Sequence, residues 1–96
     1  MPHYVIMYRP PRASFPSDAT AEEGAAVSQH FAYLTELMNR GILLMAGRRD
    51  DAEYGIAIIE CTDLSAAREI VSGDPVVQAG VFSARVDDFK LALWRK

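Results

Sequence analysis

The 96-residue chain is half hydrophobic, has one cysteine, and carries a formal net charge of −3 with its ten basic residues scattered along the sequence. This length predicts one domain over residues 1–96, the lone cysteine excludes an internal disulfide, and the scattered charge argues against nucleic acid as the main partner. No apolar run approaches the roughly 20 residues of a membrane span, and no signal-peptide pattern opens the chain, so we expect a cytoplasmic protein.

The first 40 residues predict a strand followed by a helix. His3 to Tyr8 is a short run rich in β-branched and aromatic residues, and two prolines end it. Thr20 followed three residues later by Glu23 matches a capping box, in which the two side chains satisfy backbone amides at a helix start. The spacing therefore predicts a helix from Thr20 to about Arg40.

A histidine borders the apolar stripe of this predicted helix. Val27, Phe31, Leu34 and Met38 recur with the period of a helix, and this spacing predicts that they form its buried face. His30 lies at the edge of that face, where the helix meets the rest of the protein.

The middle of the chain predicts two strands joined by a hairpin. Gly41 is the expected left-handed residue after the helix, and Ile42–Ala46 is an apolar run bounded by Gly47. Arg48–Glu53 is polar and predicts the hairpin loop. Tyr54–Cys61 is the third predicted strand.

The last third predicts a second helix, a short helical turn and a final strand. Thr62-Asp63 is a helix-capping signal, and Asp74-Pro75 places an N-cap before a proline, which starts a turn that runs through Gln78. Phe82–Trp94 predicts the final strand. Its apolar positions change phase midway, so we expect a bulge or break near Asp87-Asp88.

The element order β-α-β-β-α-β predicts an α+β fold of the ferredoxin-like type, with an antiparallel sheet and both helices on one face. In this topology the first and third strands are central. Both faces of these strands are apolar, as in Val5 and Met7 on one face and Ile6 on the other. One face lacks helices, so we predict a homodimer through the open sheet face. An exposed sheet with scattered apolar residues is the alternative.

Two stretches resemble the YCII-related (YciI-like) family of small dimeric α/β-barrel proteins. They read QHFAYLTELMNRGILLMAG (29–47) and GIAIIECTDLSAAREIVSGDPVVQAGVFSARVDDF (55–89). The resemblance implies a dimeric α/β barrel whose active site is built on a His–Asp pair, which in this sequence is His30 and Asp74. It also implies a precedent, the dehalogenation of a chlorinated hydroxyquinol-type aromatic. The family often has proline where Arg48 stands, so the resemblance leaves the substrate open.

The same two residues support acid–base chemistry by their own properties. An imidazole with an ordinary pKa of about 6.5 exchanges protons near neutral pH, and a neighbouring carboxylate fixes its tautomer. Asp74 can be that carboxylate because it follows the second helix, which lies on the same side of the sheet as the first. The alternative is structural: His30 bonds to a carbonyl or a capping carboxylate, and Asp74 is only an N-cap.

Four other residues are candidates for substrate binding: Tyr8 and Tyr54 on strands, and Arg9 and Arg48 at strand ends, where they would attract an anion. Packing and solvation are the alternative explanations for the tyrosines and arginines respectively. The acidic pairs have no histidine or cysteine at ligand spacing, so we expect no metal. No cofactor-binding motif is present, and we expect no cofactor.

Three functions remain open from the sequence. The first is a small cofactor-independent enzyme of the lyase, isomerase or dehalogenase type, which uses the His–Asp pair on a small cyclic or aromatic substrate. The second is a non-catalytic dimer that binds a small ligand or acts as an accessory protein. The third is a cofactor-free monooxygenase on the same dimeric barrel.

Overall fold

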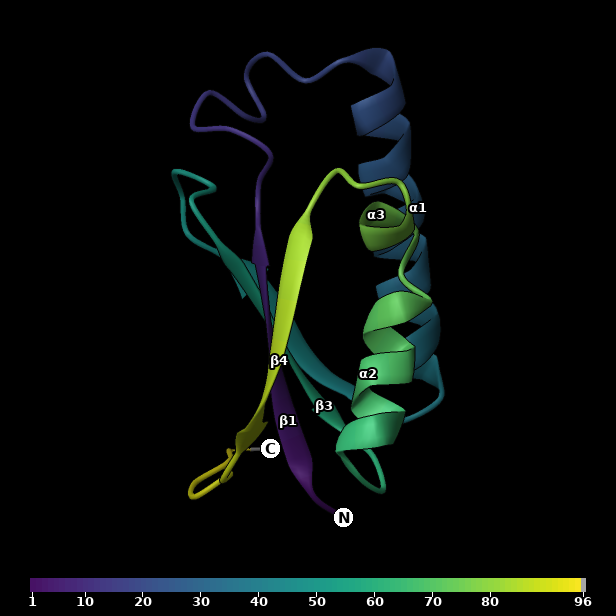
Figure 1. The fold of residues 1–96 in the computed structure, drawn as a ribbon. Helices are drawn as coiled ribbons and strands as arrows, with labels where there is room; N and C mark the ends of the chain where they lie inside the picture. Colours follow the sequence, from purple (N-terminus) through teal and green to yellow (C-terminus); the bar gives the residue numbers. More distant parts are fainter. Residues whose placement is uncertain (96) are drawn as a thin grey trace.

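The computed structural model describes residues 1–95, which form a four-stranded antiparallel sheet with helices packed on one face (Figure 1). The last residue of the predicted domain, at position 96, lies outside the described residues. The elements are, in chain order, β1 (His3–Arg9), α1 (Ala21–Asn39), β2 (Leu43–Arg48), β3 (Gly55–Glu60), α2 (Leu64–Ser72), α3 (Pro75–Gln78) and β4 (Ser83–Phe89).

The strand order is β2-β3-β1-β4, with every neighbouring pair antiparallel. The predicted ferredoxin-like arrangement is therefore confirmed, including the central positions of β1 and β3. Ile6 of β1 lies between Ala57 of β3 and Val86 of β4 in the register. This row of small and branched side chains forms the floor of the core beneath α1 and α2.

The start of α1 follows the predicted capping box. The Thr20 hydroxyl accepts a hydrogen bond from the Glu23 amide at 3.1 Å, and the Glu23 carboxylate accepts from the Thr20 amide at 2.9 Å. Arg12 adds a second link, because its guanidinium donates to Glu23 at 2.7 Å and to Asp18 at 2.9 Å. The loop over residues 10–19 is thereby fastened to the first turn of α1.

The prediction for the buried face of α1 is wrong, because the helix is rotated about its axis relative to the predicted orientation. The buried residues are Ala26, His30, Leu34 and Leu37, so the imidazole lies in the centre of the face rather than at its edge. Phe31 and Met38, both expected inside, have exposed fractions of 59% and 50%. Apolar residues occur all round this helix, so their period alone did not select one face.

The hairpin between β2 and β3 begins later than predicted. Gly47 and Arg48 still pair with Ile56 and Gly55, so β2 runs through Arg48 and the loop begins at residue 49. A polar residue on an edge strand keeps its backbone ladder while its side chain faces solvent or a pocket, and for this reason hydrophobicity placed the strand end too early.

The final strand ends well before the predicted Trp94, at a break close to Asp87-Asp88 as expected, and it pairs with β1 without a bulge. Asp87 and Asp88 pair in regular register with Val5 and Tyr4, and the strand ends at Phe89. Residues 90–95 have no regular secondary structure. The change of hydrophobic phase therefore marks the end of pairing, since β1 offers no partner beyond its first residues.

Helices cover one face of the sheet and leave the other face open. Side chains at even positions of β1 pack under the helices, whereas Val5 and Met7 lie on the face that carries no helix (Figure 1). Ile56 and Ile58 of β3 and Met45 of β2 share that open face by register. Among residues 1–95, no helix combines the length and apolar character needed to cross a membrane.

Candidate active site

The structure brings His30 and Asp74 together, although 44 residues separate them in the chain. His30 projects from α1 and Asp74 is the N-cap of α3, which crosses beside α1. The imidazole Nδ1 lies 2.7 Å from Asp74 Oδ2 and 3.0 Å from Oδ1. Both side chains are buried, with exposed fractions of 5% for His30 and 0% for Asp74.

Three donors converge on the Asp74 carboxylate. Besides His30, the Tyr8 hydroxyl donates to Oδ2 at 2.9 Å and the Val76 amide donates to Oδ1 at 3.1 Å. A buried carboxylate needs such donors because it has lost its hydration. Since the carboxylate accepts, the hydrogen-bond network assigns a proton to Nδ1, and in the neutral ring the lone pair is then on Nε2.

The imidazole ring is fixed by aromatic neighbours. Tyr8 meets it edge to face with ring centroids 4.9 Å apart, and the centroids of Phe31 and Phe82 lie at 5.5 and 5.8 Å. Among the hydrogen bonds of the described residues, none engages His30 Nε2. This nitrogen is the atom through which His30 can act on a ligand.

Tyr8 donates its phenolic proton rather than releasing it. Burial raises the pKa of Tyr8 well above its usual value of 10.0, and the negative charge and hydrogen bond of Asp74 raise it further. At neutral pH the hydroxyl is therefore a hydrogen-bond donor, and its partner is Asp74. The hydroxyl of Tyr8 is therefore engaged by Asp74, and it is the ring of Tyr8 that lines the pocket and is placed to contact a substrate.

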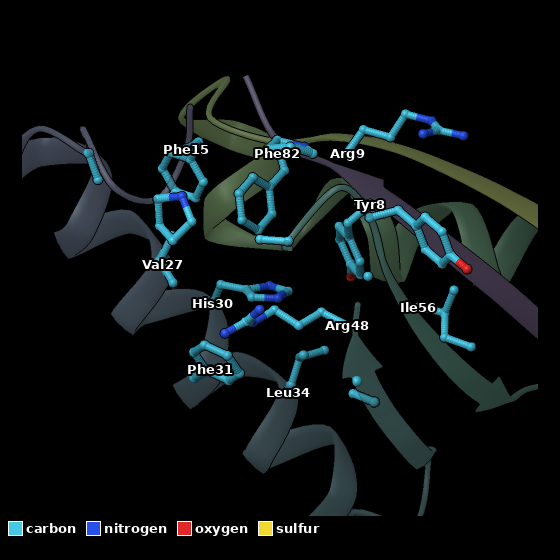
Figure 2. A pocket seen from close by; sticks show the side chains of 18 of the residues that line it. Tyr8, Arg9, Phe15, Val27, His30, Phe31, Leu34, Arg48, Ile56 and Phe82 are labelled. Atoms are coloured by element: carbon cyan, nitrogen blue, oxygen red, sulfur yellow. The ribbon is translucent and has the colours of Figure 1, made fainter. Parts of the chain in front are cut away.

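A pocket of about 460 Å³ lies in front of His30 (Figure 2). Its walls come from α1, from the strand ends of the hairpin and from the loop over residues 10–19. Asp74 does not reach this pocket, because His30 and Tyr8 stand between it and the space. The carboxylate can therefore orient the imidazole without touching a ligand.

The other predicted substrate-binding residues border the same pocket in different ways. Arg48 extends into the space in Figure 2, on the side where His30 and Phe31 also project. Arg9 borders the pocket, but its guanidinium points away from His30 and donates to Met7 Sδ at 3.6 Å. Tyr54 also lines the pocket, and the Arg49 guanidinium lies 5.6 Å from the centroid of its ring.

Sequence reasoning missed the aromatic lining of the pocket. Phe15, Phe31 and Phe82 all face the space, and Phe15 meets Phe82 edge to face at 5.6 Å. Phe15 was visible as a lone aromatic within a polar, proline-rich loop, and such a residue needs a buried partner. Phe82 gave no signal of its own, because it fell at the start of the predicted final strand, where an aromatic residue is explained by packing.

No group of three His, Cys, Asp or Glu side chains comes together as metal ligands anywhere in residues 1–95. Cys61 is buried, and burial raises the pKa of its thiol, so it lacks the character of a reactive thiolate. The chemistry available at the pocket therefore centres on one imidazole and one guanidinium.

Comparison with known proteins identifies relatives of this fold. The family model described as the YCII-related domain matches residues 1–90. Muconolactone isomerase aligns with a TM-score of 0.70 at 10% identity, covering 94% of this chain and 90% of that chain. The 5-chloro-2-hydroxyhydroquinone dehydrochlorinase of Burkholderia phenoliruptrix, in complex with 2,5-dihydroxybenzoquinone, aligns with a TM-score of 0.60 at 20% identity, covering 93% and 95%.

A third structure, the cofactor-independent oxygenase SnoaB from Streptomyces nogalater, aligns with a TM-score of 0.49 at 15% identity, covering 96% of this chain and 93% of that chain. No curated protein sequence matches the chain. At these identities the isomerase and the dehydrochlorinase share the fold of this chain.

Proposed function

We propose that this chain, which belongs to the YCII-related domain family, is a small acid–base enzyme in which His30 transfers a proton at Nε2 and Asp74 positions the imidazole. The observation that supports this most is the buried pair, with Nδ1 held 2.7 Å from the carboxylate while the ring borders a 460 Å³ pocket. A base fixed on one side and open to a ligand on the other is what general acid–base catalysis requires.

The proposed chemistry begins with the neutral imidazole. Nε2 accepts a proton from the substrate, and the Asp74 carboxylate stabilises the imidazolium that results. Returning the proton to a different atom completes an isomerisation. Loss of a leaving group after the proton transfer completes an elimination, as in a lyase or dehalogenase. Neither course moves electrons to or from an external carrier, so the proposal includes no cofactor.

The substrate we propose is small and cyclic or aromatic. A volume of about 460 Å³ suits a single substituted ring, and the phenylalanine side chains around it offer stacking and edge contacts. Two relatives of the fold are named for such molecules, muconolactone and 5-chloro-2-hydroxyhydroquinone. These compounds are therefore the first to test.

We further propose that the protein is a homodimer through the open sheet face. Val5, Met7, Ile56 and Met45 lie on this face, where no helix of the chain covers them. Burying several such side chains contributes about 1.5–3 kcal/mol each before ordering costs, which is enough to hold two copies together.

The experiment is a turnover assay on both compounds with wild-type protein and His30→Gln. We expect His30→Gln to lose roughly 10²–10⁴-fold in kcat/KM, because the acid–base group is gone. His3→Gln is the matched control, since His3 lies at the end of β1 and pairs with Glu60 at 3.3 Å outside the pocket. Full activity in His30→Gln would refute the proposal. Binding without turnover of either compound would favour the non-catalytic binder.

A further inference from the structure

We propose that Arg48 binds a carboxylate group of the ligand, so that the pocket takes a planar ring that carries a carboxylate. This inference rests on the proposed function only for the role of His30 beside the ring. The binding preference itself is independent of catalysis and can be measured without turnover.

The charge of the pocket lining is the first argument. Although the whole protein has a net charge of −3, the charged residues that line this pocket are Arg9 and Arg48, and the lining contains no aspartate or glutamate. Asp74, the nearest acidic group to His30, is already engaged by three donors behind the wall. The space accordingly favours an anion over a cation or a neutral group.

The position of Arg48 is the second argument. It pairs with Gly55, which pairs on its other side with Tyr8, so its side chain lies on the face of the sheet that carries the site. A Cβ at Gly55 would lie 3.5 Å from Arg48 Cβ and 3.2 Å from Gly47 O. The tight approach to the Gly47 carbonyl favours glycine at position 55, and the Arg48 side chain extends over the pocket in Figure 2.

The hydrogen bonds of the guanidinium are the third argument. Arg48 Nη1 donates to the carbonyl oxygens of Arg49 and Asp50 at 2.8 and 3.0 Å, which fixes the group to its own loop. Within residues 1–95, Nε and Nη2 of Arg48 make no hydrogen bond, and no carboxylate forms an ion pair with it. Its neighbour Arg49, by contrast, is paired with Asp51 and Glu53.

The guanidinium edge formed by Nε and Nη2 of Arg48, which makes no hydrogen bond within residues 1–95, favours a carboxylate over other anions. Nε–H and one Nη2–H point in parallel, and this pair of donors matches the two oxygens of a carboxylate. With the carboxylate at Arg48, the ring of the ligand lies among Phe31, Phe82 and His30, where the aromatic side chains can contact its faces and edge. The imidazole Nε2 then meets the ring rather than the anion.

The test compares benzoate with benzamide, which has the same shape and no charge. Dissociation constants are measured by NMR titration of wild-type protein, Arg48→Gln, Arg48→Lys, Arg9→Gln and Arg49→Gln. We expect wild-type protein to bind benzoate at least about tenfold more tightly than benzamide, as two charge-assisted hydrogen bonds predict. Arg48→Gln should abolish this preference, and Arg48→Lys should keep only part of it.

The two controls separate a specific contact from general charge. Arg49→Gln removes one positive charge beside the pocket and should retain the full preference for benzoate. Arg9→Gln removes a charge of the lining itself and should lower the preference much less than Arg48→Gln does, because the Arg9 guanidinium points away from His30. The proposal is overturned if Arg48→Gln keeps the preference, if Arg48→Lys keeps all of it, or if benzoate fails to bind at millimolar concentration. His30→Gln should bind benzoate with unchanged selectivity, so loss of catalysis and loss of anion binding are distinguishable.

Discussion

Tyr8 and His30 donate hydrogen bonds to the same oxygen of Asp74, at 2.9 and 2.7 Å. The two donors come from β1 and α1, and the acceptor begins α3. Three elements distant in sequence are therefore joined at one buried carboxylate. The orientation of the imidazole depends on this junction.

Asp74→Asn should change the tautomer of His30. The amide nitrogen of asparagine is a donor, so its approach to Nδ1 favours the tautomer with the proton on Nε2, and the lone pair that faces the pocket is lost. We expect activity to fall by roughly two to four orders of magnitude. The ¹⁵N chemical shifts of the His30 ring report which nitrogen carries the proton. An unchanged tautomer in Asp74→Asn would contradict the assigned network.

Tyr8→Phe should lower stability while preserving the shape of the pocket. The variant deletes one donor to a buried carboxylate and leaves the ring in contact with His30, so we expect a loss of about 1–3 kcal/mol in the free energy of unfolding. If Tyr8 acts on catalysis through Asp74, to which its hydroxyl donates, kcat should fall while KM stays close to the wild-type value. Urea denaturation and steady-state kinetics measure the two effects. A fall in kcat no larger than that of Tyr54→Phe would argue against a positioning role.

Tyr8 should also affect stability in alkaline solution. Folding raises the pKa of Tyr8, through burial first and Asp74 second, from a usual value of 10.0. Above about pH 10 the unfolded chain loses this proton while the folded protein keeps it, so stability falls as the pH rises. Tyr8→Phe removes this contribution, and its free energy of unfolding should decline less steeply above pH 10. Equal slopes for the two proteins would contradict the prediction.

Glu23 should contribute stability that acid removes. Its hydrogen bonds from Arg12, and second from the Thr20 amide, lower the pKa of this carboxyl to about 2 from its usual 4.5. The stabilisation is therefore present above pH 4.5 and is lost as the pH falls toward 2. Glu23→Gln should flatten this part of the stability profile. Glu22→Gln, which removes the same charge one residue earlier, should leave the profile steep.

The open sheet face should hold two copies of the chain together. Sedimentation of the wild-type protein at micromolar concentration should give twice the 10.6 kDa of one chain. Met7→Glu places a charge on the central strand of that face and should yield the single-chain mass. Met38→Glu, at an exposed position of α1, serves as the control and should remain a dimer. A wild-type mass of one chain would exclude the dimer.

Local chemistry made part of this structure predictable from the sequence. The Thr20–Glu23 capping box and the Asp74-Pro75 start of α3 were confirmed because each motif is satisfied by neighbours a few residues away. The order of elements was sufficient to predict the sheet topology. Such signals need no knowledge of distant contacts.

The pairing of His30 with Asp74 was expected from the resemblance, but other features that depend on distant contacts were missed. The buried face of α1 was misplaced because His30 is held inside by Asp74, a polar contact that hydrophobic periodicity ignores. The hydrogen bond from Tyr8 to the same carboxylate joins residues 66 apart, and no local sequence pattern predicts it. The end of β4 depends on the length of β1 rather than on the residues of β4 itself.

Asp74 caps α3 with Oδ1, and its Oδ2 makes the shorter of its two contacts with His30. Helix initiation accepts serine, threonine, asparagine or aspartate, but among these only aspartate also offers an anion to the imidazole. If the proposed mechanism holds, a change to another capping residue would leave a chain that still folds and no longer transfers protons. A selection that scores expression alone and one that scores turnover should therefore enrich different residues at this position.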